Sequence, residues 1–295
     1  MNEPLVSIGM PVYNGEKYIR RALDSLLAQD HENMELIISD NASTDSTWEV
    51  LQTYACQDRR IILFRQSENI GPIQNFQFVL DQARGEYFLW AAHDDYRDNN
   101  YVSTLLKIMN LRRGLEFSCP KVVKIKPDNC VIADQKFPDE ANFSITYRSR
   151  ILMMSAQAAW VYGLFRTASL RFIYPKVTKT GLVWGSDTII NLHYIINQRI
   201  CGTNDTTIYQ MKTGLSAQVY KPKSVWARIR FCAVMISQAF GLLLESDLTL
   251  ARKLRLAPFV GLYLNAQIFH WQNNRAARFV MGVTRYVYHG LKKRV

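Results

Sequence analysis

The first hundred residues alternate short apolar runs with stretches of helical periodicity. The apolar runs predict β-strands at Leu5–Met10, Met34–Ser39, Ile61–Arg65 and Tyr87–Ala92, the first of which is expected to stop at Pro11. Such a β-α-β alternation is typical of a parallel sheet covered by helices on both faces. The sequence therefore predicts an α/β fold with a mostly parallel sheet.

Helices are predicted after each of the first three strands. From Glu16 onward, apolar side chains recur at i, i+3, i+4, i+7 and i+8, which places them on one helix face. A second helix is expected from about Asp45 to Tyr54, with Ser43 or Thr44 as its cap. The third is expected over Pro72–Ala83, with proline in its first turn.

Beyond Tyr96 the alternation becomes less regular, and no internal repeat is visible. The patterns predict helices near residues 99–112, 144–156 and 188–197, and strand-like stretches at 116–133, 160–165 and 201–209. The composition then changes at Lys221, where three helical apolar segments punctuated by Arg and Lys begin.

The net charge of +11 is confined to this last part of the chain. Residues 1–220 hold 23 basic and 23 acidic side chains, whereas residues 221–295 hold 13 basic and 2 acidic ones. A charge spread over the whole chain would have suggested nucleic acid as a partner. A neutral body with a basic helical region does not, and no nucleic-acid partner is expected.

The basic region contains apolar runs that are too short or too polar to span a membrane. Phe231–Leu244 is free of charge for 14 residues, and Leu256–Asn274 carries several polar side chains. The last segment, Ala276–Val295, mixes aromatic and basic residues, a pattern typical of helices that lie on an anionic bilayer. The alternative is a helical subdomain packed on the sheet with a solvated basic face.

Cysteine usage and the N-terminus indicate the cellular compartment. Five cysteines, an odd number without a CxxC pair, predict neither a disulfide framework nor a zinc site. The stretch Met1–Tyr13 lacks the basic and apolar regions of a signal peptide. A cytoplasmic protein is therefore expected, peripheral at the inner face of the cell membrane if the basic helices bind lipid.

Polar residues follow three of the predicted strands, where ligands bind in an open parallel sheet. They are Pro11–Gly15, Asp40–Asp45 and His93–Tyr96, and none contains a glycine-rich phosphate loop. The adjacent carboxylates of Asp94 and Asp95 would repel each other unless a divalent cation, such as one that grips a diphosphate, lay between them. The alternative is a polar loop that caps the next helix.

These segments resemble the family 2 glycosyltransferases, which have the GT-A fold, use nucleotide sugars and invert the anomeric centre. The resemblance lies in ordered matches at Val6–Gly15, Glu35–Thr47, Asn69–Gly71, Ala83–Tyr87 and Asp94–Asp95. It implies a GT-A domain over residues 1–220, with a nucleotide-binding half (1–98) and an acceptor-binding half (99–220). Residues 221–295 would form a basic amphipathic helical region.

The resemblance also implies roles for individual residues. Nucleotide contacts are implied for Pro11, Tyr13, Asn14, Asp40 and Asp94. Tyr13 would line the base pocket, Asp40 would accept a hydrogen bond from the base, and Asp94 would contact the ribose. Asp95 would ligate Mn²⁺ or Mg²⁺ on the diphosphate. Ala92, where many members carry an aspartate, leaves fewer carboxylates for the cation.

An inverting transfer needs a base that takes the proton of the acceptor hydroxyl. Asp187 is the candidate, because it precedes the predicted helix at 188–197 and resembles the acidic residue that lines the acceptor side in the family. The same position also suits a helix cap. Trp184 could stack on an acceptor sugar or belong to the core.

The predicted function is transfer of a sugar from a nucleoside-diphosphate donor to a glycan or polyprenyl-linked acceptor in cell-envelope polysaccharide synthesis. The alternative is a nonenzymatic protein with a degenerate GT-A fold whose basic region binds membrane or nucleic acid. The retention of Tyr13, Asp40, Asp94 and Asp95 favours the enzyme.

Overall fold

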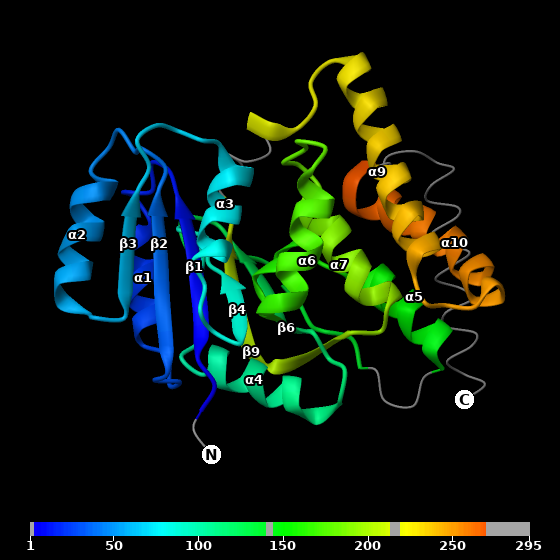
Figure 1. Cartoon of the computed structure of the whole chain (residues 1–295), viewed down its shortest axis with the longest axis horizontal. Helices are drawn as coiled ribbons and strands as arrows, with labels where there is room; N and C mark the ends of the chain where they lie inside the picture. Colours follow the sequence, from blue (N-terminus) through cyan, green and yellow to red (C-terminus); the bar gives the residue numbers. More distant parts are fainter. Residues whose placement is uncertain (1–2, 140–143, 213–218, 270–295) are drawn as a thin grey trace.

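A computed structural model describes residues 3–139, 144–212 and 219–269 as a mixed sheet flanked by helices (Figure 1). The strand order is β3-β2-β1-β4-β8-β6-β9-β5, and β7 pairs with β6 outside this path. The strands are β1 Val6–Val12, β2 Met34–Asp40, β3 Ile61–Arg65, β4 Tyr87–Trp90, β5 Tyr96–Arg97, β6 Phe117–Ile125, β7 Val131–Gln135, β8 Leu164–Arg166 and β9 Ile200–Met211.

The N-terminal strands form the parallel part of the sheet, as the sequence predicts. β1 pairs in parallel with β2 and β4, and β2 pairs in parallel with β3. The intervening helices are α1 Ile19–Leu27, α2 Thr47–Gln57 and α3 Pro72–Asp81. Strand β1 runs through Pro11 to Val12, because its register partner β2 continues to Asp40. The predicted end at Met10 was therefore two residues early.

The second half of the sheet mixes directions and carries the remaining helices of the domain. β8 lies antiparallel between β4 and β6, whereas β6 and β9 are parallel. The helices are α4 Tyr101–Leu111, α5 Ile145–Ser155, α6 Thr167–Thr178 and α7 Ser186–Ile196. Since α3 packs on α6 and α6 on α7, these three helices form one layer, and α4 packs on β6 and β9.

Two local expectations in this half were wrong. The strand predicted at 160–165 begins as a 3₁₀ turn, Ala158–Tyr162, and only β8 follows as strand. The sequence reading gave no helix at 167–178, where α6 lies with Pro175 inside it. A proline in a helix interior removes a hydrogen bond and weakens the helical signal, whereas packing of Leu170, Ile173 and Val177 in the core supplies the missing stabilisation.

The described part of the basic region consists of two helices that share the core of the sheet. They are α9 Val225–Glu245 and α10 Leu250–Leu264, followed by a π-helical turn at Asn265–Phe269. Phe231, Met235, Ala239 and Leu243 of α9 are buried in one row and belong to the main hydrophobic cluster. The predicted segment Ala276–Val295 lies outside the described residues.

Helix α9 is longer than the charge-free run that the sequence shows. It spans 21 residues, an 18-residue stretch of it has a mean hydropathy of 1.5, and it is the one helix among residues 3–139, 144–212 and 219–269 long and apolar enough to cross a membrane. Such a signal from a single helix is weak, and one row of α9 packs on the protein itself.

Candidate active site

The loop after β1 is joined to the loop after β2 by Asn14. The Asn14 amide donates to Ser43 Oγ at 2.9 Å, and its side-chain oxygen accepts from the Thr44 amide at 2.9 Å. Asn14 adopts a positive φ of 51°, a conformation that asparagine tolerates better than most residues. Tyr13 beside it is 43% exposed, so its ring is free to meet a ligand. Pro11 is buried within β1 opposite Ser39.

Asp40, at the end of β2, is fully buried and held by internal partners. Its carboxylate accepts from the Ser43 amide at 3.2 Å and pairs with Arg65 Nε at 3.3 Å. The Arg65 guanidinium also lies over the Trp48 ring, 4.9 Å from its centroid. The structure therefore places Asp40 and Tyr13 at the same sheet edge, with Arg65 as a neighbour that the sequence reading had not singled out.

Asp95 is buried directly below the more open Asp94. One Asp95 oxygen accepts from the Met211 amide at 2.8 Å, which ties the loop after β4 to the end of β9. Burial, and then the charge of Asp94, raise the pKa of Asp95 to about 8. A cation between the two carboxylates would relieve this repulsion and favour the ionised form.

This pair of carboxylates suits a hard divalent cation that also binds phosphate. Mg²⁺ is commonly held by one or two carboxylates, with substrate phosphates and water completing the shell. Within the described part of the chain, no group of three or more His, Cys, Asp and Glu side chains could hold a metal ion. The pair of Asp94 and Asp95 fits a cation that also binds the oxygens of a diphosphate.

Arg97 lies behind Asp95 and is an unexpected buried cation. Its three guanidinium nitrogens are buried without a hydrogen bond to any of the described residues, and the group lies 5.1 Å from the centroid of Tyr101. Burial lowers the pKa of Arg97, while Tyr101 and Asp95 favour its charged form. Arg97 therefore offsets part of the negative charge of the carboxylate pair.

Tyr162 interacts electrostatically with carboxylates of both the nucleotide-binding half and the acceptor-binding half. Tyr162 is partly buried, and its pKa is raised well above the ordinary value, first by burial and then by the charges of Asp95, Asp94 and Asp187. Its backbone oxygen accepts from Tyr101 Oη at 3.0 Å. The next residue must be glycine, because a Cβ on Gly163 would lie 2.3 Å from the Ser118 carbonyl oxygen.

Asp187 lies in the first turn of α7 and lines a cavity of about 400 Å³, here called the Asp187 cavity. Its walls include Tyr162, Trp184 and Lys212. The helix cap is Gly185, with φ 87°, but one Asp187 oxygen still accepts from the Thr188 amide at 2.7 Å. Burial raises the pKa of Asp187, which suits a group that must take up a proton.

Lys212 is a site residue that the sequence reading missed. It follows β9, lines the Asp187 cavity and interacts electrostatically with Asp95, Asp187 and Asp94. Burial lowers its pKa, and these carboxylates act in the opposite direction. A lysine three residues after the strand predicted at 201–209 was the only available signal, and its proximity to all three acids depends on the pairing of β9 with β6.

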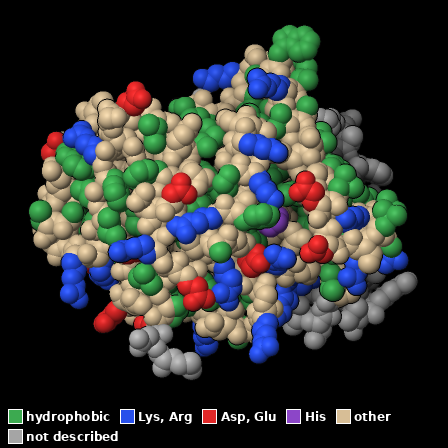
Figure 2. All heavy atoms as spheres, viewed as in Figure 1, with side chains coloured by type: hydrophobic (Ala, Val, Ile, Leu, Met, Phe, Trp, Pro, Cys, Tyr) green, Lys and Arg blue, Asp and Glu red, His purple; other side chains and the backbone are tan. Residues whose placement is uncertain are grey.

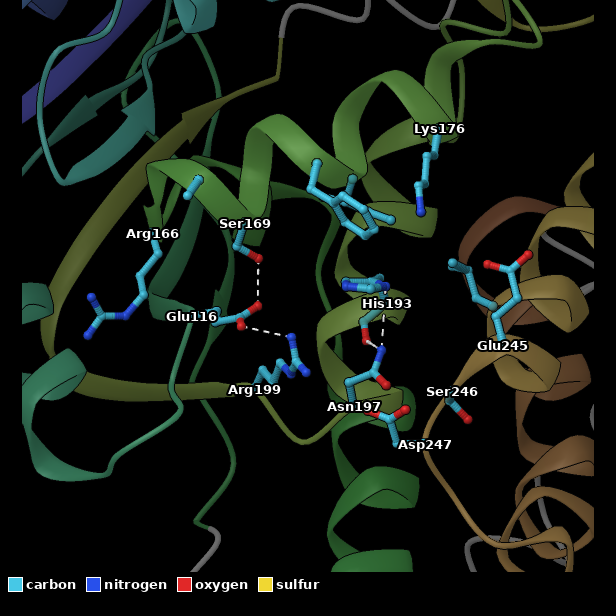
Figure 3. A pocket seen from close by; sticks show the side chains of 14 residues that line it. Glu116, Arg166, Ser169, Lys176, His193, Asn197, Arg199, Glu245, Ser246 and Asp247 are labelled. Carbon is cyan, nitrogen blue, oxygen red and sulfur yellow. Dashed lines mark hydrogen bonds and ion pairs between the residues drawn. The ribbon is translucent and has the colours of Figure 1, made fainter.

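A second pocket, of about 600 Å³, lies at the other end of β9 (Figure 3). In it Glu116 accepts from Arg199 at 2.8 Å and from Ser169 at 2.6 Å. The His193 imidazole faces Asn197, and burial lowers its pKa to about 4. Since Arg199 precedes β9 and Lys212 follows it, the whole strand separates this pocket from the candidate active site.

The fold and the acidic edge, formed by Asp40, Asp94 and Asp95, agree with the GT-A fold and the motifs that the sequence resemblance predicts. The family model described as "Glycosyl transferase family 2" matches residues 7–164. The chain belongs to this family, and both the predicted family and the predicted fold class are confirmed.

Solved structures share the fold at low sequence identity. The structure resembles TarS 1–349 of S. aureus with a TM-score of 0.63 and 21% identity, over 88% of this chain and 72% of that one. It also resembles the mannosyltransferase PcManGT of Pyrobaculum calidifontis, with a TM-score of 0.52 and 16% identity over 99% and 83% of the two chains.

Curated relatives match the first part of the chain. An uncharacterized glycosyltransferase of Haemophilus influenzae is 38% identical over 109 residues, which is 37% of this chain and 44% of the relative. The putative teichuronic acid biosynthesis glycosyltransferase TuaG of Bacillus subtilis is 35% identical over 116 residues, or 39% and 46% of the two chains. The match thus spans less than half the length of these relatives.

Proposed function

We propose that this chain is an inverting glycosyltransferase that moves a sugar from a nucleoside-diphosphate donor to a glycan or lipid-linked acceptor of the cell envelope. The observation that carries the proposal is the Asp187 cavity, in which Asp187, Tyr162 and Lys212 line one space. The charges of Asp94 and Asp95 act on Tyr162 and Lys212 in its wall. Relatives support the donor class, since TarS has been solved with UDP-GlcNAc and PcManGT with GDP-Man and Mn²⁺.

The donor would bind across the ends of β1, β2 and β4. Tyr13 is exposed enough to pack on the base, and Pro11 and Asn14 shape the loop beneath it. Asp40 would reach the base once the pocket is filled, and Asp94 would contact the ribose. A divalent cation at Asp95 would neutralise charge on the diphosphate when bound, and Lys212 would add a second positive charge there.

Asp187 would act as the general base on the acceptor side of the cavity. Its carboxylate would take the proton of the acceptor hydroxyl as that oxygen bonds to the anomeric carbon of the donor. The bond between this carbon and the diphosphate oxygen would break, and its electron pair would leave with the diphosphate. Attack from the Asp187 side, opposite the diphosphate, inverts the anomeric centre.

A panel of nucleotide sugars, with and without Mn²⁺, tests this proposal. Binding and slow donor hydrolysis are measured for wild type and for Asp94→Asn, with the exposed Asp81→Asn as the matched control. We expect one donor to raise the melting temperature and to be hydrolysed in a cation-dependent manner, and Asp94→Asn to weaken both effects. The absence of any nucleotide response in wild type would favour the degenerate fold and contradict the proposal.

We also propose a peripheral membrane location through residues 221–295, with residues 1–98 and 99–220 as the donor and acceptor halves. Val225, Trp226 and Ile229, at the start of α9, are 68%, 80% and 53% exposed. Basic side chains surround them, at Lys221, Lys223, Arg228 and Arg230. In Figure 2 this apolar and basic tip projects from the upper end of the molecule. This surface supports the proposal of a cytoplasmic protein that lies at the inner face of the cell membrane.

Vesicle cosedimentation at low and high salt measures the membrane contact. Each basic residue near an anionic bilayer contributes on the order of 1 kcal/mol, a contribution that salt screens. Replacing Lys221 and Lys223 by Gln should therefore reduce binding to anionic vesicles at low salt, whereas the exposed Lys107→Gln on α4 should not. Equal binding to neutral and anionic vesicles would contradict this location.

A further inference from the structure

A groove beside α9 continues the Asp187 cavity toward the surface. It has a volume of about 650 Å³ and is lined by Thr180–Trp184, by Val219, Tyr220 and Pro222, and by the first two turns of α9, including Trp226 and Arg230. We call it the α9 groove. Val183, Trp184 and Tyr220 line both the groove and the Asp187 cavity, so the two spaces share a wall.

Helix α9 is anchored against the start of the helix that carries Asp187. A Cβ on Gly185 would lie 3.0 Å from Met235 Cε and 3.5 Å from Phe231 Cζ. The α9 groove therefore has a fixed position relative to the proposed general base, because both depend on the same packed contact. The strand ends that carry Asp40 and Asp94 and the start of α9 also face the same side of the molecule (Figure 1).

The side chains that line the Asp187 cavity and the α9 groove change in chemical character from Asp187 toward the protein surface. Trp184 lines both the Asp187 cavity and the α9 groove, and it offers an aromatic surface suited to a sugar face. Farther out, Arg230 lines the groove beside Trp226. Beyond the rim, Val225 and Ile229 continue the exposed apolar surface of Trp226. The order is thus acid, aromatic ring, cation and apolar surface.

This order fits one class of acceptor. A fully hydrated glycan gains little from an apolar groove that ends on an exposed tryptophan, and a soluble phosphate needs no apolar surface. An amphiphile with a sugar, a phosphate and a hydrocarbon chain matches each zone in turn. We propose that the α9 groove binds the phosphate and the adjoining isoprenyl chain of a lipid-linked acceptor, with the phosphate at Arg230 and the chain on Trp226.

This inference rests on the proposed transferase function, because the groove leads to Asp187. The sugar of the acceptor would reach the Asp187 cavity past Trp184, while the chain would pass over the tip of α9 into the bilayer. The tip would then hold the enzyme and the acceptor at one surface.

Equilibrium dialysis with farnesyl phosphate, farnesol and inorganic phosphate as probes tests the α9 groove. Wild type should bind farnesyl phosphate about tenfold more tightly than farnesol, since a hydrogen-bonded charge pair contributes on that order. Arg230→Gln should bind the two probes equally. Trp226→Ala should weaken binding of both, and the exposed Arg252→Gln on α10 should match wild type.

Nucleoside-diphosphate binding measured on the same proteins separates this inference from the proposed function. The groove variants should bind the donor nucleotide as wild type does, because neither residue lies at the donor edge. Equal affinity of wild type for farnesyl phosphate and farnesol, or an unchanged preference in Arg230→Gln, would overturn the inference. If wild type binds no nucleotide, the transferase function is overturned. A preference of the same protein for farnesyl phosphate over farnesol would still support lipid binding in the α9 groove.

Discussion

The two halves of the candidate site are built in different ways. In the donor half, the polar residues follow adjacent strands whose register aligns Val12 with Asp40, so neighbouring loops meet through local bonds such as that from Asn14 to Ser43. In the acceptor half, Asp187 and Lys212 come from a helix and a strand that meet only through tertiary packing. The donor half therefore follows from short motifs, whereas the acceptor half depends on the whole domain.

The largest expected effect separates the chemistry of the two halves. Asp187→Asn keeps the shape of the side chain but cannot take the proton, so we expect transfer to fall by about 10² to 10⁴. Nucleotide binding should be retained, because it belongs to the donor half. Transfer rates and nucleotide affinity measure the two effects, with Asp247→Asn, an exposed acid beyond α9, as the control.

The pH profile sharpens this prediction. Because burial raises the pKa of Asp187, its active ionised form should be lost on acidification at a higher pH than for an ordinary aspartate. Transfer should fall as pH drops through this raised pKa, and the acid limb should be absent from the residual activity of Asp187→Asn. A wild-type rate in the mutant would place the general base elsewhere.

The next effect belongs to the donor half. Asp95→Asn retains an oxygen for the Met211 amide but removes a negative charge from the pair, so the fold should persist. We expect cation-dependent nucleotide affinity to fall on the order of tenfold to a hundredfold. Calorimetry with a nucleoside diphosphate and Mn²⁺ measures it, and Asp81→Asn should leave it unchanged. Undiminished affinity in Asp95→Asn would contradict the ligand assignment.

A smaller effect concerns the junction of the halves. Gly163→Ala would place a Cβ 2.3 Å from the Ser118 carbonyl oxygen, and we expect a loss of about 1–3 kcal/mol in the free energy of unfolding. Gly241→Ala in α9 is the matched control, because nothing lies within 4 Å of its Cβ. Chemical denaturation measures both variants. Equal stabilities would show that the strand–turn contact at Gly163 can relax freely.

The smallest effect tests whether the C-terminal helices support the acceptor half. Tyr263 in α10 donates to the Thr188 carbonyl oxygen at 2.7 Å, next to Asp187, and both partners are buried. Tyr263→Phe should cost about 1 kcal/mol of unfolding free energy. Tyr54→Phe, which removes a more exposed bond to Asp24, should cost less. If Tyr263→Phe lowers the free energy of unfolding no more than Tyr54→Phe does, the hydrogen bond from α10 does not stabilise the acceptor half.

The sequence by itself determined the parallel half of the sheet, the family and the acidic edge. These features depend on local patterns: apolar strands of four to seven residues in the structure, such as β4 and β1, and polar residues directly after them. It also located Asp187 at the start of a helix, because α7 is apolar along most of its length. The elements that local patterns encode were therefore predicted from the sequence with small errors at the strand ends.

Only the tertiary structure decided the rest of the site. Lys212 joins Asp95 and Asp187 because β9 runs beside β6. Arg97 is buried because β5 pairs with β9 and packs on α1, with the Tyr101 ring beside its guanidinium. The basic helices pack against the core through Phe231 and Met235, and this packing forms the α9 groove. These contacts join residues far apart in the chain, and their stability comes from burial shared by several elements, which no single segment reveals.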